Sequence, residues 1–243
     1  MRIGLIAEKY IDNDLDYNFA QMTSWLRKCD GKGYNLLCFG ESFAHGFEAL
    51  SWKHEDDLAI ALTQTDQRID RLREEAQKTK TGIAFGYIEK VVDKLYSSYM
   101  VVSENGGILV NYRRASAGWK EPIADPNHYL EGSDYSPFNS QGKSIGIAIC
   151  GDLWHDDLLE IFKNQSSDLL LWPLYINYTP EFWYGGEREA YAEQAGYLKR
   201  PVLMINCLSN PPTQAFGGCY VFNSGRIEQE LPLGQSGILT VEL

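Results

Sequence analysis

Lys143-Ser-Ile-Gly-Ile-Ala-Ile-Cys150 is an apolar run that ends at an abrupt turn, Gly151-Asp152, and residues 156–163 then follow a helical pattern. We therefore predict a buried strand, a turn at Cys150 and a helix. A thiol at the carboxyl end of a strand lies where parallel α/β sheets place their chemistry. The amino terminus of the helix favours negative charge, which makes a thiolate easier to form. The stretch thus predicts an α/β protein with Cys150 as a candidate nucleophile.

Strands and helices alternate on both sides of this stretch. Before it, apolar periodicity predicts strands at residues 2–7, 36–39 and 82–89 and helices at residues 14–30 and 66–79. After it, the pattern predicts strands at residues 169–173, 202–206 and 237–242 and a helix at residues 187–198. Asn105-Gly106 and Ser224-Gly225 predict hairpins that join residues 97–102 to 108–112 and residues 218–222 to 227–231. Two rounds of β-α-β, each followed by a hairpin, predict a four-layer α-β-β-α sandwich of two mixed sheets with outer helices.

Length and composition limit the number of domains and the classes of partner that this chain can have. The chain has no linker or repeat, so we expect one domain over residues 1–243. Its net charge of −11 argues against nucleic acid and anionic membranes as partners. The apolar start meets Glu8-Lys9 too early for a signal peptide or a membrane span. Five cysteines without a Cys-x-x-Cys pair fit reduced thiols in the cytoplasm. Four scattered histidines lack metal-ligand spacing, and we expect no metal and no cofactor.

Two further side chains could act with Cys150. Glu41 follows the apolar strand at residues 36–39, where partial burial would raise its pKa toward that of a useful base; it could also be a helix cap or a solvent-facing acid. Lys120 lies beside Trp119 in an irregular stretch, and a desolvated ammonium can stabilise an oxyanion; the alternative is a surface lysine. The Gly151 N–H is a second candidate oxyanion donor. Cys150 itself could instead be a small core residue, the commonest fate of cysteine.

The order of these residues resembles that of the nitrilase superfamily, the carbon–nitrogen hydrolases. In that family a Glu follows the second strand, a Lys follows the first hairpin and a Cys opens a nucleophile elbow. Asn35-Leu-Leu-Cys-Phe-Gly-Glu-Ser-Phe43 is similar to the family's acidic box, and Ile149-Cys-Gly-Asp-Leu-Trp154 is similar to its Cys box. Residues 168–173 and 188–195 resemble its apolar strand ending in Pro and a later helix. The resemblance spans essentially the whole chain.

The resemblance implies a hydrolase that cleaves a non-peptide C–N bond of a small amide through a Cys thioester. Cys150 would be the nucleophile, Glu41 the general base and Lys120 the cation that stabilises the oxyanion. An N-carbamoyl hydrolase or nitrilase of the same family is an alternative, as is a catalytically silent binding member. An acyltransferase with the same triad, or an unrelated thiol hydrolase that pairs Cys150 with His155, are further alternatives. Many members dimerise, so we expect a homodimer that takes small amide, carbamoyl or nitrile substrates.

Two features depart from the family pattern. The family's Lys directly follows Tyr-Arg, whereas Tyr112-Arg113 is followed here by Arg114. Spacing to Cys150 favours Lys120, and Arg114 stays open as the cation. The family's second Glu has no clean match: Glu121 is the first choice, with Asp125 and Glu131 nearby. We expect Trp119, Trp154 and Tyr175 to form walls of a substrate pocket. The alternative is that these side chains pack in the core or at a dimer contact.

Overall fold

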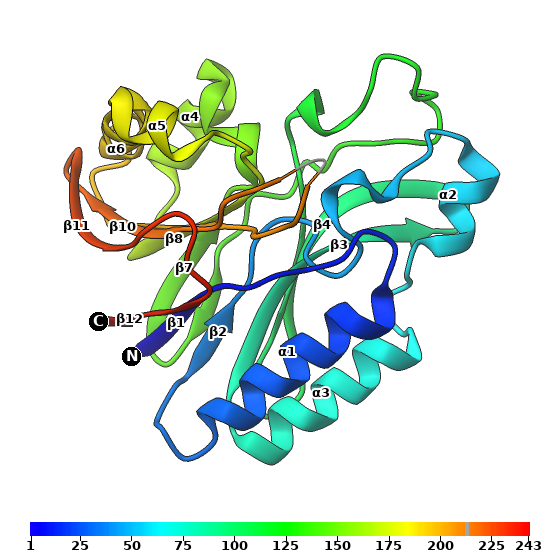
Figure 1. Cartoon of the computed structure of the whole chain (residues 1–243), viewed down its shortest axis with the longest axis horizontal. Coiled ribbons are helices and arrows are strands. Elements are labelled where there is room, and N and C mark those ends of the chain that lie inside the picture. Colours follow the sequence, from blue (N-terminus) through cyan, green and yellow to red (C-terminus); the bar gives the residue numbers. More distant parts are fainter. Residues whose placement is uncertain (212–213) are drawn as a thin grey trace.

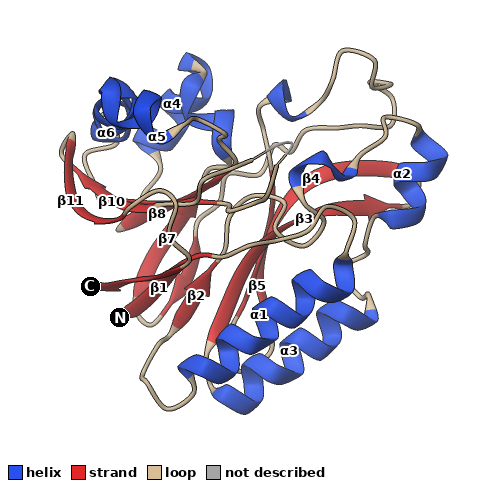
Figure 2. Ribbon diagram, viewed as in Figure 1, coloured by secondary structure: helices blue, strands red, loops and turns tan. Residues whose placement is uncertain are grey.

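The computed structural model describes residues 1–211 and 214–243. Its strands form two six-stranded sheets, and helices cover the outer side of each (Figure 1). Figure 2 shows the strands gathered in the middle of the molecule and the helices at its periphery. Both sheets contribute residues to one buried cluster, so they pack face to face. These observations confirm the predicted four-layer sandwich.

The first sheet has the strand order β12-β1-β2-β3-β4-β5. Its parallel centre consists of β1 (Arg2–Ala7), β2 (Leu36–Cys38) and β3 (Gly82–Val91). Antiparallel pairing adds β4 (Lys94–Val102), β5 (Ile108–Arg113) and β12 (Gly237–Glu242). Outside lie α1 (Leu15–Cys29) and α3 (Gln67–Thr79). Each begins at an aspartate, Asp14 or Asp66, whose carboxylate accepts a backbone N–H of the first turn.

The second sheet has the order β11-β10-β9-β8-β7-β6. Its parallel centre consists of β7 (Lys143–Ile147), β8 (Leu169–Leu174) and β9 (Val202–Asn206). Antiparallel pairing adds β6 (Phe138–Ser140), β10 (Cys219–Asn223) and β11 (Arg226–Leu231). Its outer helices are α4 (Asp156–Asn164), α5 (Pro180–Phe182) and α6 (Arg188–Gly196), which lie together in Figure 1.

The two-residue period of a strand divides β1 between two cores. Leu5 belongs to the cluster between the sheets, together with Leu171 of β8 and Leu203 of β9. The next residue, Ile6, belongs to the cluster that α1 completes with Phe19. Successive side chains of a strand point to opposite faces, so one buried strand serves both layers. This double burial explains why the parallel strands appear in the sequence as continuous apolar runs.

Several predicted boundaries differ in the structure. β3 and β4 continue to a tight hairpin at Val92-Asp93, which lacks a glycine although Val92 has a φ of 58°. α2 (His54–Ile60) and β6 were not predicted, and the predicted helix at residues 187–198 is preceded by α5 and a π-helical turn, η4 (Trp183–Glu187). β7 ends at Ile147 because the chain coils into a short 3-10 helix, η3 (Cys150–Trp154). Within the two described ranges, no helix is both long enough and apolar enough to cross a membrane.

Candidate active site

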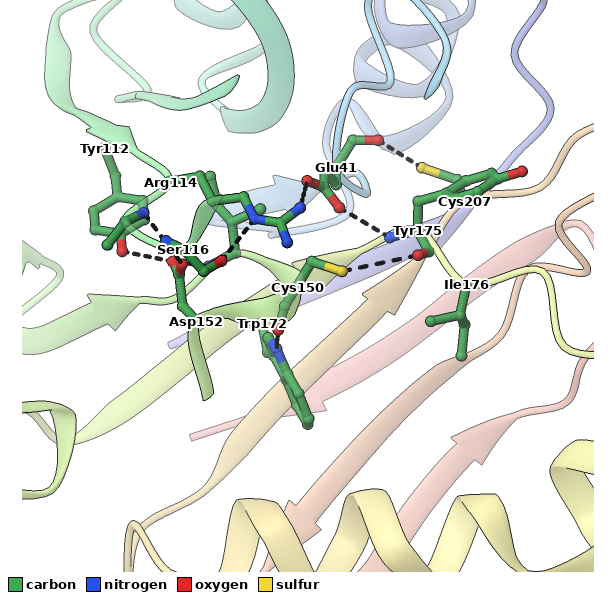
Figure 3. A network of polar contacts seen from close by, with 12 residues as sticks. Glu41, Tyr112, Arg114, Ser116, Cys150, Asp152, Trp172, Tyr175, Ile176 and Cys207 are labelled. Carbon is green, nitrogen blue, oxygen red and sulfur yellow. Dashed lines mark hydrogen bonds and ion pairs between the residues drawn. The ribbon is translucent and has the colours of Figure 1, made fainter. Parts of the chain in front are cut away.

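Cys150 is the first residue of η3 and follows β7 by a sharp turn (Figure 3). Its φ of 43° is in the left-handed region, a strained conformation for a residue with a side chain and typical of a nucleophile elbow. Trp172 Nε1 donates to the Cys150 carbonyl over 2.9 Å, and Cys150 Sγ donates to the Tyr175 carbonyl over 3.9 Å. Gly151 follows in the first turn of η3, where backbone N–H groups lack helical partners. The turn therefore presents a thiol beside an available backbone donor.

Glu41 follows β2 and is buried, with 1% of its surface exposed. Its Oε1 accepts from Arg114 Nη1 over 2.8 Å, and its Oε2 accepts from the Tyr175 N–H over 3.2 Å. The thiol of Cys207 donates to the Glu41 carbonyl over 2.9 Å. The carbonyl of the same Tyr175 accepts from Cys150 Sγ, which places the thiol next to the Glu41 carboxylate (Figure 3). Partners therefore hold both carboxylate oxygens in place beside the thiol.

Arg114 supplies the positive charge at this place. It lies one residue after β5, and its N–H donates to the Ser97 carbonyl over 2.8 Å, which extends the pairing of the two strands. The side chain is 3% exposed. Its Nε donates to Ser116 Oγ over 2.9 Å, while Nη1 bonds Glu41. The guanidinium is therefore fixed at two of its three nitrogens.

Lys120, the first choice for the cation from the sequence, lies elsewhere. Its ammonium pairs with Glu131 and donates to the Tyr129 carbonyl over 2.9 Å. A short 3-10 helix, η2 (Ala117–Trp119), turns the chain immediately before the lysine, whose side chain bonds the later segment at residues 129–131. The structure therefore brings Arg114, the open alternative, to Glu41 and places Lys120 with Glu131.

Asp152 joins the elbow to the segment that carries the cation, a role that the sequence did not reveal. It is completely buried. Its Oδ1 accepts the N–H groups of Ala115 and Ser116 over 3.1 and 2.7 Å. Its Oδ2 accepts the Tyr112 hydroxyl over 2.6 Å and the Ile149 N–H over 2.9 Å. One carboxylate thus fixes two segments that lie far apart in the sequence (Figure 3).

Burial sets the protonation of the acid and the thiol. It raises the pKa of Glu41, an effect that the charge and hydrogen bond of Arg114 oppose. It also raises the pKa of Cys150 to about 12, with the negative charge of Glu41 adding to the effect and Arg114 opposing it. The thiol is therefore neutral near pH 7. A carboxylate next to it, whose charge acts on the thiol, is placed to accept its proton during a reaction.

The other predicted residues are spread over the molecule. Tyr175 lies at the site, and its ring stacks on Phe47 with 3.9 Å between the centroids. Trp119 is buried in a small separate core, and Trp154 is 45% exposed on η3. Glu121 is exposed, and the lysine beside it pairs with a different acid. Of the predicted pocket and support residues, the structure therefore brings Tyr175 and Gly151 to the thiol and leaves the others outside.

A family model described as carbon-nitrogen hydrolase matches residues 2–242. The chain belongs to the carbon-nitrogen hydrolase family. Its relatives and structural neighbours include amidases of the nitrilase superfamily, which confirms the resemblance seen in the sequence.

Two curated members of the family show how far their sequences differ from that of this chain. The chain is 24% identical over 177 residues to N-carbamoylputrescine amidase of Arabidopsis thaliana, an alignment that covers 70% of the chain and 57% of that protein. It is 23% identical over 174 residues to the omega-amidase NIT2 of Mus musculus, which covers 68% of the chain and 61% of that protein. The chain thus spans less than two thirds of the length of either relative.

Solved structures establish the fold. A mutant of the Nesterenkonia AN1 amidase from the nitrilase superfamily superposes with a TM-score of 0.81 at 18% identity, over 100% of this chain and 90% of that one. The carbon-nitrogen hydrolase of Helicobacter pylori G27 gives a TM-score of 0.78 at 16% identity, over 99% and 87% of the two chains. Both neighbours share the layered sandwich.

Proposed function

We propose that this carbon-nitrogen hydrolase cleaves the C–N bond of a small amide through a thioester on Cys150. One observation carries the proposal: the Glu41 carboxylate bonds the Arg114 guanidinium over 2.8 Å, and Tyr175 bonds both this carboxylate and the thiol of Cys150. A buried acid and cation beside a half-buried thiol offer a base, an oxyanion donor and a nucleophile. We assign these roles to Glu41, Arg114 and Cys150, with the Gly151 N–H as the second oxyanion donor.

In the first half-reaction, Glu41 takes the proton of the Cys150 thiol while the sulfur attacks the carbonyl carbon. The tetrahedral oxyanion accepts hydrogen bonds from Arg114 and the Gly151 N–H, and each such donor is commonly worth roughly 3–4 kcal/mol. Collapse breaks the C–N bond, and ammonia or an amine leaves with the proton from Glu41. In the second half-reaction, Glu41 deprotonates a water that attacks the thioester, and the departing sulfur regains that proton.

Two observations support a small amide or N-carbamoyl compound as the substrate. Relatives of this chain carry the names N-carbamoylputrescine amidase and omega-amidase. The stacked rings of Phe47 and Tyr175 next to the thiol would suit a small, partly apolar substrate. A nitrile is the alternative substrate, because the same attack of sulfur on carbon would begin its hydrolysis.

Ammonia release from a panel of amides, N-carbamoyl amines and nitriles tests the proposal. We expect turnover of at least one class and its loss in Cys150→Ala, with little change in melting temperature. Cys29→Ala, at the distant end of α1, is the matched control and should retain activity. An activated ester should leave an acyl adduct on Cys150 that intact mass detects. If the panel gives no ammonia and the ester leaves no adduct, the chain is a silent binding member and the proposal fails.

We further propose a homodimer formed through the helical layer over the second sheet. Large apolar side chains are exposed in this layer: Trp154 at 45%, Phe182 at 53%, Tyr184 at 42% and Tyr197 at 49%. Clustered exposure of this kind marks an interaction surface, whereas single exposed apolar residues are ordinary. Light scattering should give twice the chain mass of 27.6 kDa, and Phe182→Glu should halve it. A monomeric wild type would contradict the dimer.

For the compartment, we propose the cytoplasm. All five cysteines are free thiols, including the one that must stay reduced to act as the nucleophile. Activity that survives only in the presence of a thiol reductant would agree with this location. Full activity after prolonged exposure to an oxidising glutathione buffer would argue against it.

A further inference from the structure

Gly151 lies directly against the guanidinium of Arg114. A Cβ built on Gly151 would stand 2.7 Å from Arg114 Nη2 and 3.0 Å from Ser116 Oγ. The φ of Gly151 is not in the left-handed region, so its backbone would accept an alanine without strain. The neighbouring side chains, and not the turn itself, therefore require the missing Cβ.

The guanidinium has little freedom to move away from such a Cβ. Its Nε is bonded to Ser116 Oγ and its Nη1 to Glu41, and the side chain is 3% exposed. A guanidinium is planar and presents its donors in a fixed fork, so a shift at Nη2 rotates the bonds at the other two nitrogens. A lysine on the same backbone would carry a single ammonium on a flexible stem, with no atom fixed at the place of Nη2.

Nη2 is also the nitrogen that is left for a ligand. In the described part of the chain, the bonds of Arg114 use Nε and Nη1. Nη2 lies over Gly151, the residue that follows the nucleophilic sulfur and carries the second oxyanion donor. A carbonyl oxygen attacked by Cys150 would accumulate its charge beside these two donors.

We propose that Gly151 and Arg114 are a matched pair, in which the absence of a Cβ at position 151 lets an arginine serve as the oxyanion-stabilising cation and aims its Nη2 at the elbow. Gly151 is then a positioning residue that acts through Arg114. This inference rests on the proposed function for its chemical meaning, but the coupling of the two positions can be measured without turnover.

A double-mutant cycle tests the pair, with kcat/KM measured on the best substrate of the panel. Gly151→Ala should lower kcat/KM by about 10- to 100-fold, chiefly in kcat, because a displacement of about 1 Å in a reacting group costs that much. In an Arg114→Lys background the same glycine change should cost less than about threefold, because Nη2 is gone and Ser116 Oγ, no longer bonded to Nε, can turn away.

Alanine substitutions at two other glycines give a graded comparison with Gly151→Ala. A Cβ on Gly118 would stand 3.3 Å from the same Arg114 Nη2, so Gly118→Ala should cost less than Gly151→Ala. A Cβ on Gly107 would stand 3.5 Å from Ser103 Oγ in ordinary contact, so Gly107→Ala should leave activity unchanged. Arg71→Lys, on the exposed side of α3, controls for the arginine exchange.

Alkylation of Cys150 by iodoacetamide gives a readout that needs no substrate. The guanidinium opposes the raised pKa of this thiol, so its displacement in Gly151→Ala should slow alkylation between about pH 7 and 10. The slowing should vanish in the Arg114→Lys background. Equal losses from Gly151→Ala in both backgrounds, in alkylation or in kcat/KM, would overturn the pair. If no substrate of the panel is hydrolysed and the activated ester leaves no adduct, the proposed function fails, and alkylation still decides the pairing.

Discussion

Replacement of Asp152 by asparagine tests how the site is held together. The carboxylate accepts four hydrogen bonds: from Ala115 N and Ser116 N at Oδ1, and from Tyr112 Oη and Ile149 N at Oδ2. Asparagine keeps the shape but replaces one oxygen with an N–H donor. Whichever oxygen is replaced, at least one buried backbone N–H then faces another donor.

The expected loss of stability follows from the less costly of the two orientations of the asparagine amide. With its nitrogen at the place of Oδ2, the Tyr112 hydroxyl can rotate to accept, and the Ile149 N–H alone loses its acceptor. An unsatisfied buried donor costs about 1–3 kcal/mol, and the bonds that remain lose the added strength of a charged acceptor. We expect Asp152→Asn to lower the free energy of unfolding by about 2–4 kcal/mol. Domains of ordinary stability, about 5–15 kcal/mol, would still fold.

Urea unfolding measures this loss as a shift in midpoint at constant slope. Tyr112→Phe removes one of the four donors and should cost about 1–2 kcal/mol. Asp168→Asn is the matched control: Asp168 is exposed and accepts the Ser144 N–H over 2.8 Å, and its replacement should stay within about 0.5 kcal/mol. If Asp152→Asn is as stable as Asp168→Asn, the bonds to Asp152 do not hold the two segments together, and the reasoning is refuted.

Two further predictions concern activity. Because the ionised form of Glu41 is the base and burial raises its pKa, kcat/KM should fall as the pH drops through a value above the ordinary glutamate pKa of about 4.3, which a pH–rate profile measures. Arg114→Met should lower kcat by about 10²- to 10³-fold, whereas Lys120→Met, which breaks the pair with Glu131, should change it less than about threefold.

A different result would contradict each of these two predictions. An acid limb at or below the ordinary glutamate value would mean that Glu41 is not the titrating base. A Lys120→Met variant as inactive as Arg114→Met would return the lysine to the site, and circular dichroism of both variants would exclude misfolding as the cause.

The layered sandwich could be predicted from the chain because its signals are local. Apolar runs, the capping residues Asp14 and Asp66, and the Asn105-Gly106 turn each act within a few residues, and their order fixes which strands can be parallel. The Val92-Asp93 hairpin was missed because its positive φ is borne by a valine, which no turn pattern anticipates.

Glu41 and Cys150 were accessible as candidates in the same way, because each follows a parallel strand, where α/β sheets place their chemistry. The two strands belong to different sheets, so only the packing of the sheets brings the two residues together. The choice between Arg114 and Lys120 was not accessible, since both lie in one irregular segment that can turn either side chain toward the thiol. That choice depends on hydrogen bonds to Ser97 of the neighbouring strand β4 and to Asp152 of η3, which hold the arginine's segment against the elbow. Spacing along a chain does not determine such contacts, because loop geometry follows the surfaces against which the loop packs.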